Sequence, residues 1–255
     1  MNATSIIIDS HTHWGHSLTM GATVTTGELL AQQKESGVTH VILIPFPSTA
    51  IASNEINVDV LREAARASSF IPYFYIREDF PRIPQEYYGG KWHWMRGVQD
   101  ASSNYRVLDD SELPALINDL TAIGKPIVFE EEFDFTRRFV EMAPELPLII
   151  PHLGMLGGNP MDFLEAFRDK RSIYFDTALA ARSTIQKFVD TIGPERILFA
   201  ADVPFGDMAN EVAKVHALTI SDADKELILS KNIIRLAKLT ALHSCCQCDT
   251  PSGQG

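Results

Sequence analysis

The sequence carries near its start the stretch Ile6-Ile7-Ile8-Asp9-Ser10-His11-Thr12-His13. Three consecutive isoleucines predict a buried β-strand, and the two histidines follow at its polar end. Side chains alternate along a strand, so His11 and His13 are expected to point the same way. Two neutral imidazoles that converge at a strand end can bind a transition metal such as zinc. The pair is equally compatible with two polar residues where a strand leaves the core, so a metal site requires ligands from other strands.

The bulk composition narrows the class of protein. The chain has 255 residues, of which 45% are hydrophobic and 22% charged, as in ordinary globular proteins. This length allows one α/β barrel or two smaller domains. A formal net charge of −11 argues against a nucleic-acid partner. We see neither an apolar run of the roughly 20 residues that span a bilayer nor a signal-peptide pattern. We therefore expect a small-molecule substrate and no nucleic-acid or membrane partner, and a homodimer stays open.

The three cysteines, Cys245, Cys246 and Cys248, lie together near the C-terminus beside His243. A metal knuckle there would need a second cysteine or histidine cluster, which the sequence does not offer. Residues 243–255 are therefore expected to form a flexible tail after a single domain at 1–242. This cysteine usage is typical of a reducing compartment and predicts a cytoplasmic protein.

Short apolar segments alternate with helical segments along the whole chain. Strands are predicted at 6–13, 41–44, 71–76, 96–99, 126–129, 148–152, 173–176 and 197–202. The stretch 79–94, with two prolines and a Gly-Gly pair, is predicted to be irregular. Regular alternation implies parallel strands with helical crossovers, and eight units in this length indicate a closed α/β fold, the (β/α)₈ TIM barrel. An open doubly wound sheet is the alternative, but no glycine fingerprint follows the first strand.

The chemistry of such a barrel lies at the C-terminal ends of its strands. The polar residues expected there are His11, His13, Arg77, Gln99, Glu130, His152, Asp176 and Asp202. Alternation is expected to turn Glu130 inward together with Val128, His152 with Ile150, and Asp202 with Leu198. Several residue types that bind metals are therefore predicted to meet in one pocket.

Seven stretches carry a family resemblance. They are IDSHTH (8–13), LDDSEL (108–113), GKPIV (124–128), IPHLG (150–154), IYFDT (173–177), RILFAADVP (196–204) and NIIRL (232–236). In this order they resemble the amidohydrolase superfamily, in the branch of amidohydrolase-related and aminocarboxymuconate-semialdehyde decarboxylase-like proteins. The resemblance implies a divalent metal, most often zinc, and a metal-activated water. It also implies that His11 and His13 are ligands, that Asp202 is a ligand and proton shuttle, and that His152 contacts the water or substrate.

The chain departs from the family at the end of the fifth strand, where a histidine is usual and this sequence has Glu130. We expect Glu130 to bind the metal through oxygen. The alternative is that the metal site has decayed and Glu130 is one of three solvated acids at 130–132. Two histidines and two carboxylates would neutralise Zn²⁺, whereas three histidines and one aspartate leave one positive charge. A neutral centre is a weaker Lewis acid, and a harder ligand set also admits Mn²⁺ or Fe²⁺.

These residues predict a metal-dependent hydrolase that acts on a small-molecule amide, cyclic amide or lactone through a metal-activated water. Asp202 would move the proton, and His152 would stabilise the oxyanion. Two alternatives stay open: a metal-dependent non-oxidative decarboxylase of a small aromatic carboxylic acid, and a non-catalytic metal- or ligand-binding barrel.

Three further residues are candidates for substrate contacts. Arg77 and Arg182 could each bind a carboxylate, although Arg77 could instead pair with an acid next to it. For Asp176, a structural hydrogen bond is as good an interpretation as a substrate contact. Asp9 is expected to be a core hydrogen-bond partner near the histidines.

Overall fold

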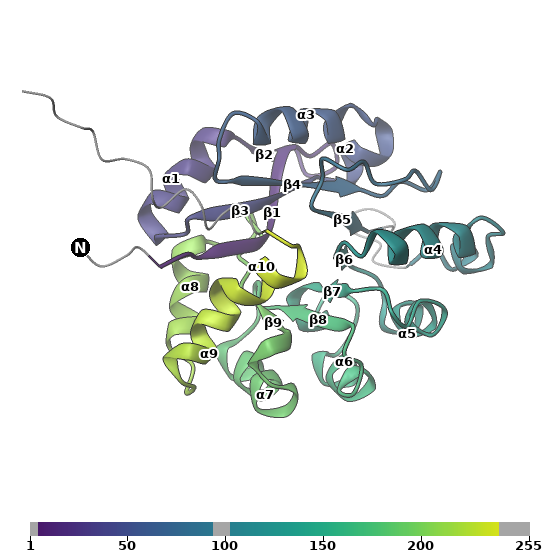
Figure 1. Cartoon of the computed structure of the whole chain (residues 1–255). Coiled ribbons are helices and arrows are strands. Elements are labelled where there is room, and N and C mark those ends of the chain that lie inside the picture. Colours follow the sequence, from purple (N-terminus) through teal and green to yellow (C-terminus); the bar gives the residue numbers. More distant parts are fainter. Residues whose placement is uncertain (1–4, 94–102, 240–255) are drawn as a thin grey trace, which may run out of the picture.

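The computed structural model describes residues 5–93 and 103–239, and its strands form a ring (Figure 1). The ring contains, in order, β1 (Ile8–His16), β3 (His40–Pro45), β4 (Phe70–Tyr75), β5 (Gly89–Trp92), β6 (Ile127–Phe129), β7 (Leu148–Ile150), β8 (Ile173–Asp176) and β9 (Ile197–Leu198). All neighbours in this order pair in parallel, and the short β2 (Thr23–Val24) adds antiparallel to the end of β1. The chain after β9 closes the ring, because Ser10 N donates to Phe199 O and His13 N to Val203 O, both at 3.0 Å. The predicted (β/α)₈ barrel is confirmed.

Helices lie around the ring of strands, and the last of them crosses the end of the ring that faces the viewer (Figure 1). They are α1 (Thr26–Ser36), α2 (Pro47–Ala52), α3 (Glu55–Ala64), α4 (Leu113–Ile123), α5 (Phe133–Met142), α6 (Pro160–Phe167), α7 (Arg182–Ile192), α8 (Met208–His216), α9 (Asp222–Glu226) and α10 (Asn232–Leu236). α1 has the capping box that Thr25 and Glu28 predict, and it ends at Gly37, whose φ of +78° suits glycine. Within the described ranges, no helix is long and apolar enough to cross a membrane.

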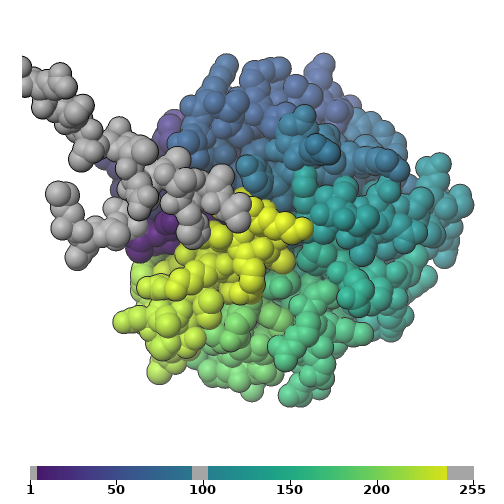
Figure 2. All heavy atoms as spheres, in the orientation of Figure 1, coloured from purple at the N-terminus to yellow at the C-terminus, as the bar shows by residue number. Residues whose placement is uncertain are grey.

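Apolar side chains form two shells. The outer shell lies between strands and helices, while a separate inner cluster fills the barrel with residues such as Ile42, Val128 and Leu198. Ile233 of α10 and Leu239 belong to the same inner cluster. In Figure 2 the C-terminal segment fills the centre of the visible face. This end of the barrel is therefore packed, and a site must open at the other end.

The fourth barrel strand is the main correction to the sequence prediction. It is β5, inside the stretch predicted to be irregular, while the strand predicted at 96–99 lies outside the described residues. β5 pairs with β4 and β6, and its Gly89 lies opposite Tyr73. A Cβ at Gly89 would clash with the Tyr73 ring and lie 2.6 Å from the Pro126 carbonyl oxygen. Glycine is required here by close packing, so a residue of low strand propensity occupies a strand.

Candidate metal centre

The two histidines of β1 reach the barrel interior because the strand contains a bulge. Asp9 lies opposite Val41 but Thr12 lies opposite Leu43, so β1 has one extra residue between them. Ile8 packs in the inner cluster, and uninterrupted alternation from it would turn His11 away from the interior. With the extra residue, His11 and His13 turn the same way, as predicted, with ring centroids 5.3 Å apart.

Asp9 holds this bulge in place. Its Oδ1 accepts hydrogen bonds from His11 N at 3.1 Å and Ala201 N at 3.0 Å, and its Oδ2 accepts one from Thr12 Oγ1 at 2.7 Å. Complete burial raises the pKa of Asp9 to about 7. The expected role as a core hydrogen-bond partner is confirmed, and Asp9 connects β1 to the segment that carries Asp202.

Asp202 approaches the histidines from the loop after β9. Its backbone lies in the left-handed region at φ +55°, and its N–H donates to His11 O at 2.8 Å. Its Oδ1 lies 3.6 Å from His11 Nε2 and 3.3 Å from His13 Nε2. Leu198 belongs to the inner cluster, as alternation along β9 predicts. Backbone conformations of this kind are uncommon outside glycine and are concentrated at functional sites.

His152 joins the centre by a different route from the predicted one. β7 ends at Ile150, and Ile149 rather than Ile150 belongs to the inner cluster, so the predicted alternation through Ile150 to His152 is wrong. His152 lies instead in the turn Pro151–Gly154 with φ +55°, which redirects its side chain. Its Nε2 is 3.7 Å from Asp202 Oδ2. The sequence identified the residue but not the turn that positions it.

Asp176, at the end of β8, orients both His11 and His152. Its Oδ2 lies 3.1 Å from His11 Nδ1, and its Oδ1 accepts from His152 N at 2.8 Å and from Ala178 N at 3.1 Å. His152 Nδ1 lies 3.3 Å from Ala178 O. These acceptors favour a proton on each Nδ1, which leaves the Nε2 atoms to face the centre. Asp176 therefore makes the structural hydrogen bonds that were one of its two interpretations.

Glu130, after β6, contacts a lysine that the sequence interpretation missed. Lys91 on β5 is completely buried, and its Nζ lies 2.5 Å from Glu130 Oε2 and 3.1 Å from His11 Nε2. His93 follows, with Nδ1 at 3.1 Å from the Glu130 carbonyl oxygen. A signal for both was present, because Lys91 and His93 have the same i, i+2 spacing as the histidines of β1. The prolines and the Gly-Gly pair of residues 79–94 conceal this signal, because they favour an irregular segment over a strand.

The charges of the centre act on one another. Burial lowers the pKa of His11 far below its usual value, and the nearby Lys91 lowers it further, so its imidazole is neutral. Burial also opposes ionisation of Glu130, but His93, Lys91 and His152 outweigh it and hold the pKa well below its usual range. For His152, burial is outweighed by the carboxylates of Asp202, Asp176 and Glu130, which raise the pKa. The same buried centre therefore lowers the pKa of His11 and raises the pKa of His152.

The arrangement fits a divalent metal. Ligand atoms of His11, His13 and Asp202 lie within 4.8 Å of one another, and all three residues are buried. Two ligands of a tetrahedral zinc site are about 3.3 Å apart, close to the separations around Asp202 Oδ1. This oxygen is buried and accepts no hydrogen bond from the residues described. A lysine ammonium has three donors, so Lys91 can keep Glu130 and release the Nε2 of His11 to a metal.

The centre lies on a cavity of about 610 Å³. His13, His93, Glu130, His152 and Asp202 contribute its polar lining. Neither predicted arginine contributes to it: Arg77 pairs with Asp79 at 3.1 Å, and Arg182 is exposed at the start of α7. The structure thus brings together the ligand atoms of His11, His13 and Asp202, places Glu130 and His152 on the same cavity, and leaves both arginines outside.

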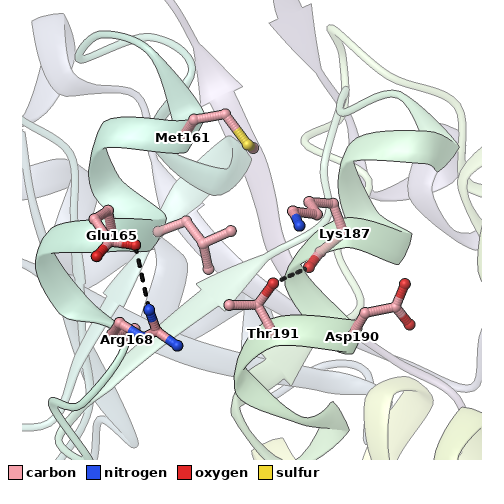
Figure 3. Close-up of a pocket in the computed structure, with 7 residues that line it drawn as sticks. Met161, Glu165, Arg168, Lys187, Asp190 and Thr191 are labelled. Atoms are coloured by element: carbon pink, nitrogen blue, oxygen red, sulfur yellow. Dashed lines mark hydrogen bonds and ion pairs between the residues drawn. The ribbon is translucent and has the colours of Figure 1, made fainter.

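A second hollow lies on the outside of the barrel, between α6 and α7 (Figure 3). Glu165 pairs there with Arg168 of its own helix at 3.5 Å, and Thr191 Oγ1 donates to Lys187 O at 2.7 Å. Its polar side chains are exposed or half-exposed and contact residues of their own helix. It offers none of the converging groups of the metal centre.

Comparison with known proteins supports the fold and the family resemblance. An amidohydrolase family model matches residues 133–239. No curated protein sequence matches the chain. Among solved structures, 2,6-dihydroxybenzoate decarboxylase from Rhizobium has a TM-score of 0.74 at 15% identity, over 92% of this chain and 99% of that one.

Two further solved structures contain metals. An amidohydrolase from Burkholderia multivorans with bound zinc has a TM-score of 0.72 at 14% identity, over 92% of this chain and 99% of that one. Dihydroxybenzoic acid decarboxylase from Polaromonas sp. JS666, with bound manganese, has a TM-score of 0.74 at 14% identity, over 92% and 98%. The family match and the shared barrel confirm the resemblance to the amidohydrolase superfamily that the seven stretches carry.

Proposed function

We propose that this protein is a metal-dependent hydrolase of small molecules whose target is an amide, a cyclic amide or a lactone. One observation carries the proposal. Buried His11, His13 and Asp202 converge at the cavity, and the Oδ1 of Asp202 has no hydrogen-bond donor among the described residues. A buried carboxylate oxygen without a donor is costly, and a bound cation would compensate it.

His11, His13 and Asp202 would hold the metal, with Glu130 as a fourth ligand. A divalent cation there supplies Lewis acidity, which polarises a carbonyl group and makes water a stronger acid. Zinc suits the imidazoles, and the two carboxylates also suit Mn²⁺ or Fe²⁺. The zinc and manganese in the two structural relatives agree with this range.

The proton transfers fall to Asp202 and His152. Asp202 lines the cavity, and its carboxylate is ionised because His11 and His13 outweigh burial and lower its pKa. It can accept the proton of the attacking water and return it to the leaving group. His152, whose pKa is raised, can donate a hydrogen bond from Nε2 to the oxygen on which negative charge develops.

Lys91 changes the charge expected from the ligand set. Glu130 in place of a histidine would neutralise a zinc centre, but the Lys91 ammonium 2.5 Å from Glu130 restores one positive charge. We propose that this pair preserves the Lewis acidity that Glu130 alone would reduce.

Metal analysis combined with a substrate panel tests the proposal. The purified protein would be stripped with a chelator, reloaded separately with Zn²⁺, Mn²⁺ or Fe²⁺, and assayed on neutral lactones, cyclic amides and linear amides. We expect one tightly bound metal per chain and hydrolysis that disappears with the chelator and returns with the metal. A protein that binds no metal stoichiometrically, or hydrolyses equally well without it, would refute the proposal.

A decarboxylase is the second candidate, and its support is the likeness to the two dihydroxybenzoate decarboxylases. In that reaction the metal would orient a carboxylated ring, and Asp202 or His152 would supply the proton. Release of CO₂ from hydroxybenzoates by the reloaded protein, without hydrolysis of lactones or amides, would select this reaction.

A further inference from the structure

The walls of the cavity differ from its polar floor. Above the metal centre the lining side chains are mainly apolar, among them Phe46, Ile51, Leu156, Leu179 and Phe205. A volume of about 610 Å³ lies within the range of sites that enclose small organic ligands. The centre would therefore meet the reacting group of a ligand, while the walls meet the rest of it.

Exposed apolar side chains gather at the mouth of this cavity. Leu18, Ile51, Leu156 and Phe205 have exposed fractions of 58, 44, 47 and 49%, and all four line it. They come from different parts of the chain: the β1–β2 connection, α2, the loop after β7 and the loop after β9. Single exposed apolar residues need no explanation, but four around one opening indicate a surface that binds apolar groups.

The hydroxyl groups of the lining are already engaged. Ser17 Oγ lies 3.4 Å from both Thr19 Oγ1 and Ser48 Oγ, and it accepts from Met20 N at 3.3 Å. Ser48 Oγ also accepts from Leu18 N at 3.1 Å. These contacts hold the β1–β2 connection against the start of α2, so the hydroxyls shape the wall.

Away from the metal centre, the described lining has no cationic side chain that could pair with a second acidic group. It contains neither lysine nor arginine; Lys91 is completely buried beside Glu130, and Arg77 pairs with Asp79. A ligand carboxylate against these walls would be desolvated without a partner, which is unfavourable. His93 lies beside Glu130, with its Nδ1 3.1 Å from the Glu130 carbonyl oxygen, so it is already engaged at the metal centre.

We infer that the substrate is an uncharged carbonyl compound with an apolar body, such as an alkyl-substituted lactone, and that multiply carboxylated substrates are excluded. The carbonyl group of this substrate rests on the proposed function, and its apolar body rests on the cavity walls. Each methylene that leaves water for such a wall improves binding about fourfold.

A series of γ-lactones with methyl, propyl and hexyl side chains tests the inference with the metal-loaded protein. We expect kcat/KM to rise about fourfold per methylene until the cavity is full. A lactone whose side chain ends in a carboxylate should be at least about tenfold poorer than its neutral analogue. Hydrolysis that ignores chain length, or prefers the carboxylate, would overturn the inference and leave the hydrolase proposal intact.

A rim variant with a matched control adds a second test. Ile51→Arg places a cation at the mouth and should reduce or reverse the discrimination against the carboxylate. Val58→Arg is the control, because Val58 on α3 is 48% exposed, close to the 44% of Ile51, and does not line the cavity. An equal effect of both variants would contradict the inference.

Binding of a non-hydrolysable probe separates the inference from the proposed function. Calorimetric titration with 2-octanone and 2-butanone measures apolar binding whether or not any lactone is cleaved. Tighter binding of 2-octanone with a negative heat-capacity change supports the apolar cavity even if hydrolysis fails. If 2-octanone binds no better than 2-butanone, the apolar body is refuted.

Discussion

Strand β1 delivers two imidazoles to the centre, whereas strand β5 delivers the ammonium group of Lys91. β1 is nine residues long, begins in an isoleucine run and contains a bulge that turns its histidines inward. β5 is four residues long, begins with Gly89-Gly90 and is a strand because β4 and β6 pair with it on both sides. The two imidazoles proposed to bind the metal thus lie on a strand with its own hydrophobic signal. Lys91, which balances the charge of Glu130, lies on a strand that forms because β4 and β6 pair with it.

Asp202 completes the β1 side, and its substitution should have the largest effect. Asp202→Asn removes the negative charge between His11 and His13 and the group that accepts the water proton. We expect kcat to fall by at least about 10³-fold and metal affinity to fall with it. Steady-state kinetics and elemental analysis measure the two effects.

The control for this prediction is Asp222→Asn, because the side chain of Asp222 on α9 is fully exposed and does not line the cavity. It should leave both readouts unchanged. Retention of more than a tenth of the activity by Asp202→Asn would remove Asp202 from the role of base.

On the β5 side, Lys91→Met should mainly affect stability. It leaves the carboxylate of Glu130 buried without its partner at 2.5 Å. We expect the metal-free protein to lose about 3–5 kcal/mol of unfolding free energy in urea, as for other broken buried pairs. With metal bound the loss should be smaller, because a cation that Glu130 binds also compensates its charge.

The double variant Lys91→Met with Glu130→Gln should recover most of the lost stability, since it removes both charges. The decisive quantity is how much more unfolding free energy Lys91→Met loses in the metal-free protein than in the metal-loaded protein. An equal loss in both states would show that Glu130 is not a ligand, whatever the activity.

A smaller effect is expected from Asp176→Asn. This substitution changes the contact between Asp176 at the end of β8 and His11 on β1. The amide can keep the oxygen that accepts from His152 N and Ala178 N, but its NH₂ group cannot accept from His11 Nδ1. His11 then loses the partner that directs its Nε2 to the centre. We expect metal affinity to fall about 10–100-fold, measured by competition with a chelator. Unchanged affinity would show that the tautomer of His11 does not depend on Asp176.

The candidate ligands could be chosen from the sequence because each lies in or shortly after an apolar strand. His11 and His13 lie in β1, Glu130 follows β6 and Asp202 follows β9, and a barrel brings such strands together at one end. Their local geometry could not be predicted, because the bulge at Asp9–Thr12 and the turn of His152 depend on backbone contacts between distant segments. The prediction therefore placed His152 at the cavity but gave it an incorrect backbone path.

The sequence interpretation missed Lys91 and proposed two arginines that do not line the cavity, for opposite reasons. A lysine is expected in water, and only the pairing of β5 with β4 and β6 and the nearby Glu130 explain its complete burial. Arg77 and Arg182 were candidates by chemistry alone, and the half-buried Arg77 pairs with Asp79, which was the alternative interpretation of this residue. The burial of each side chain separates Lys91 from the two arginines, and burial cannot be read directly from the sequence.

The smallest expected effect tests why β5 is a strand at all. Gly89→Ala places a methyl group against the Tyr73 ring and the Pro126 carbonyl oxygen, so β5 must shift away from β4 or β6. We expect a loss of about 1–3 kcal/mol in urea unfolding. Gly27→Ala is the matched control: it lies in α1, its nearest neighbour would be 4.0 Å away, and alanine should stabilise the helix by up to about 1 kcal/mol. If both variants stabilise the protein, close packing at Gly89 is not what holds Lys91 in the centre. If Gly89→Ala alone destabilises it, the position of Lys91 depends on its neighbours rather than on its own strand.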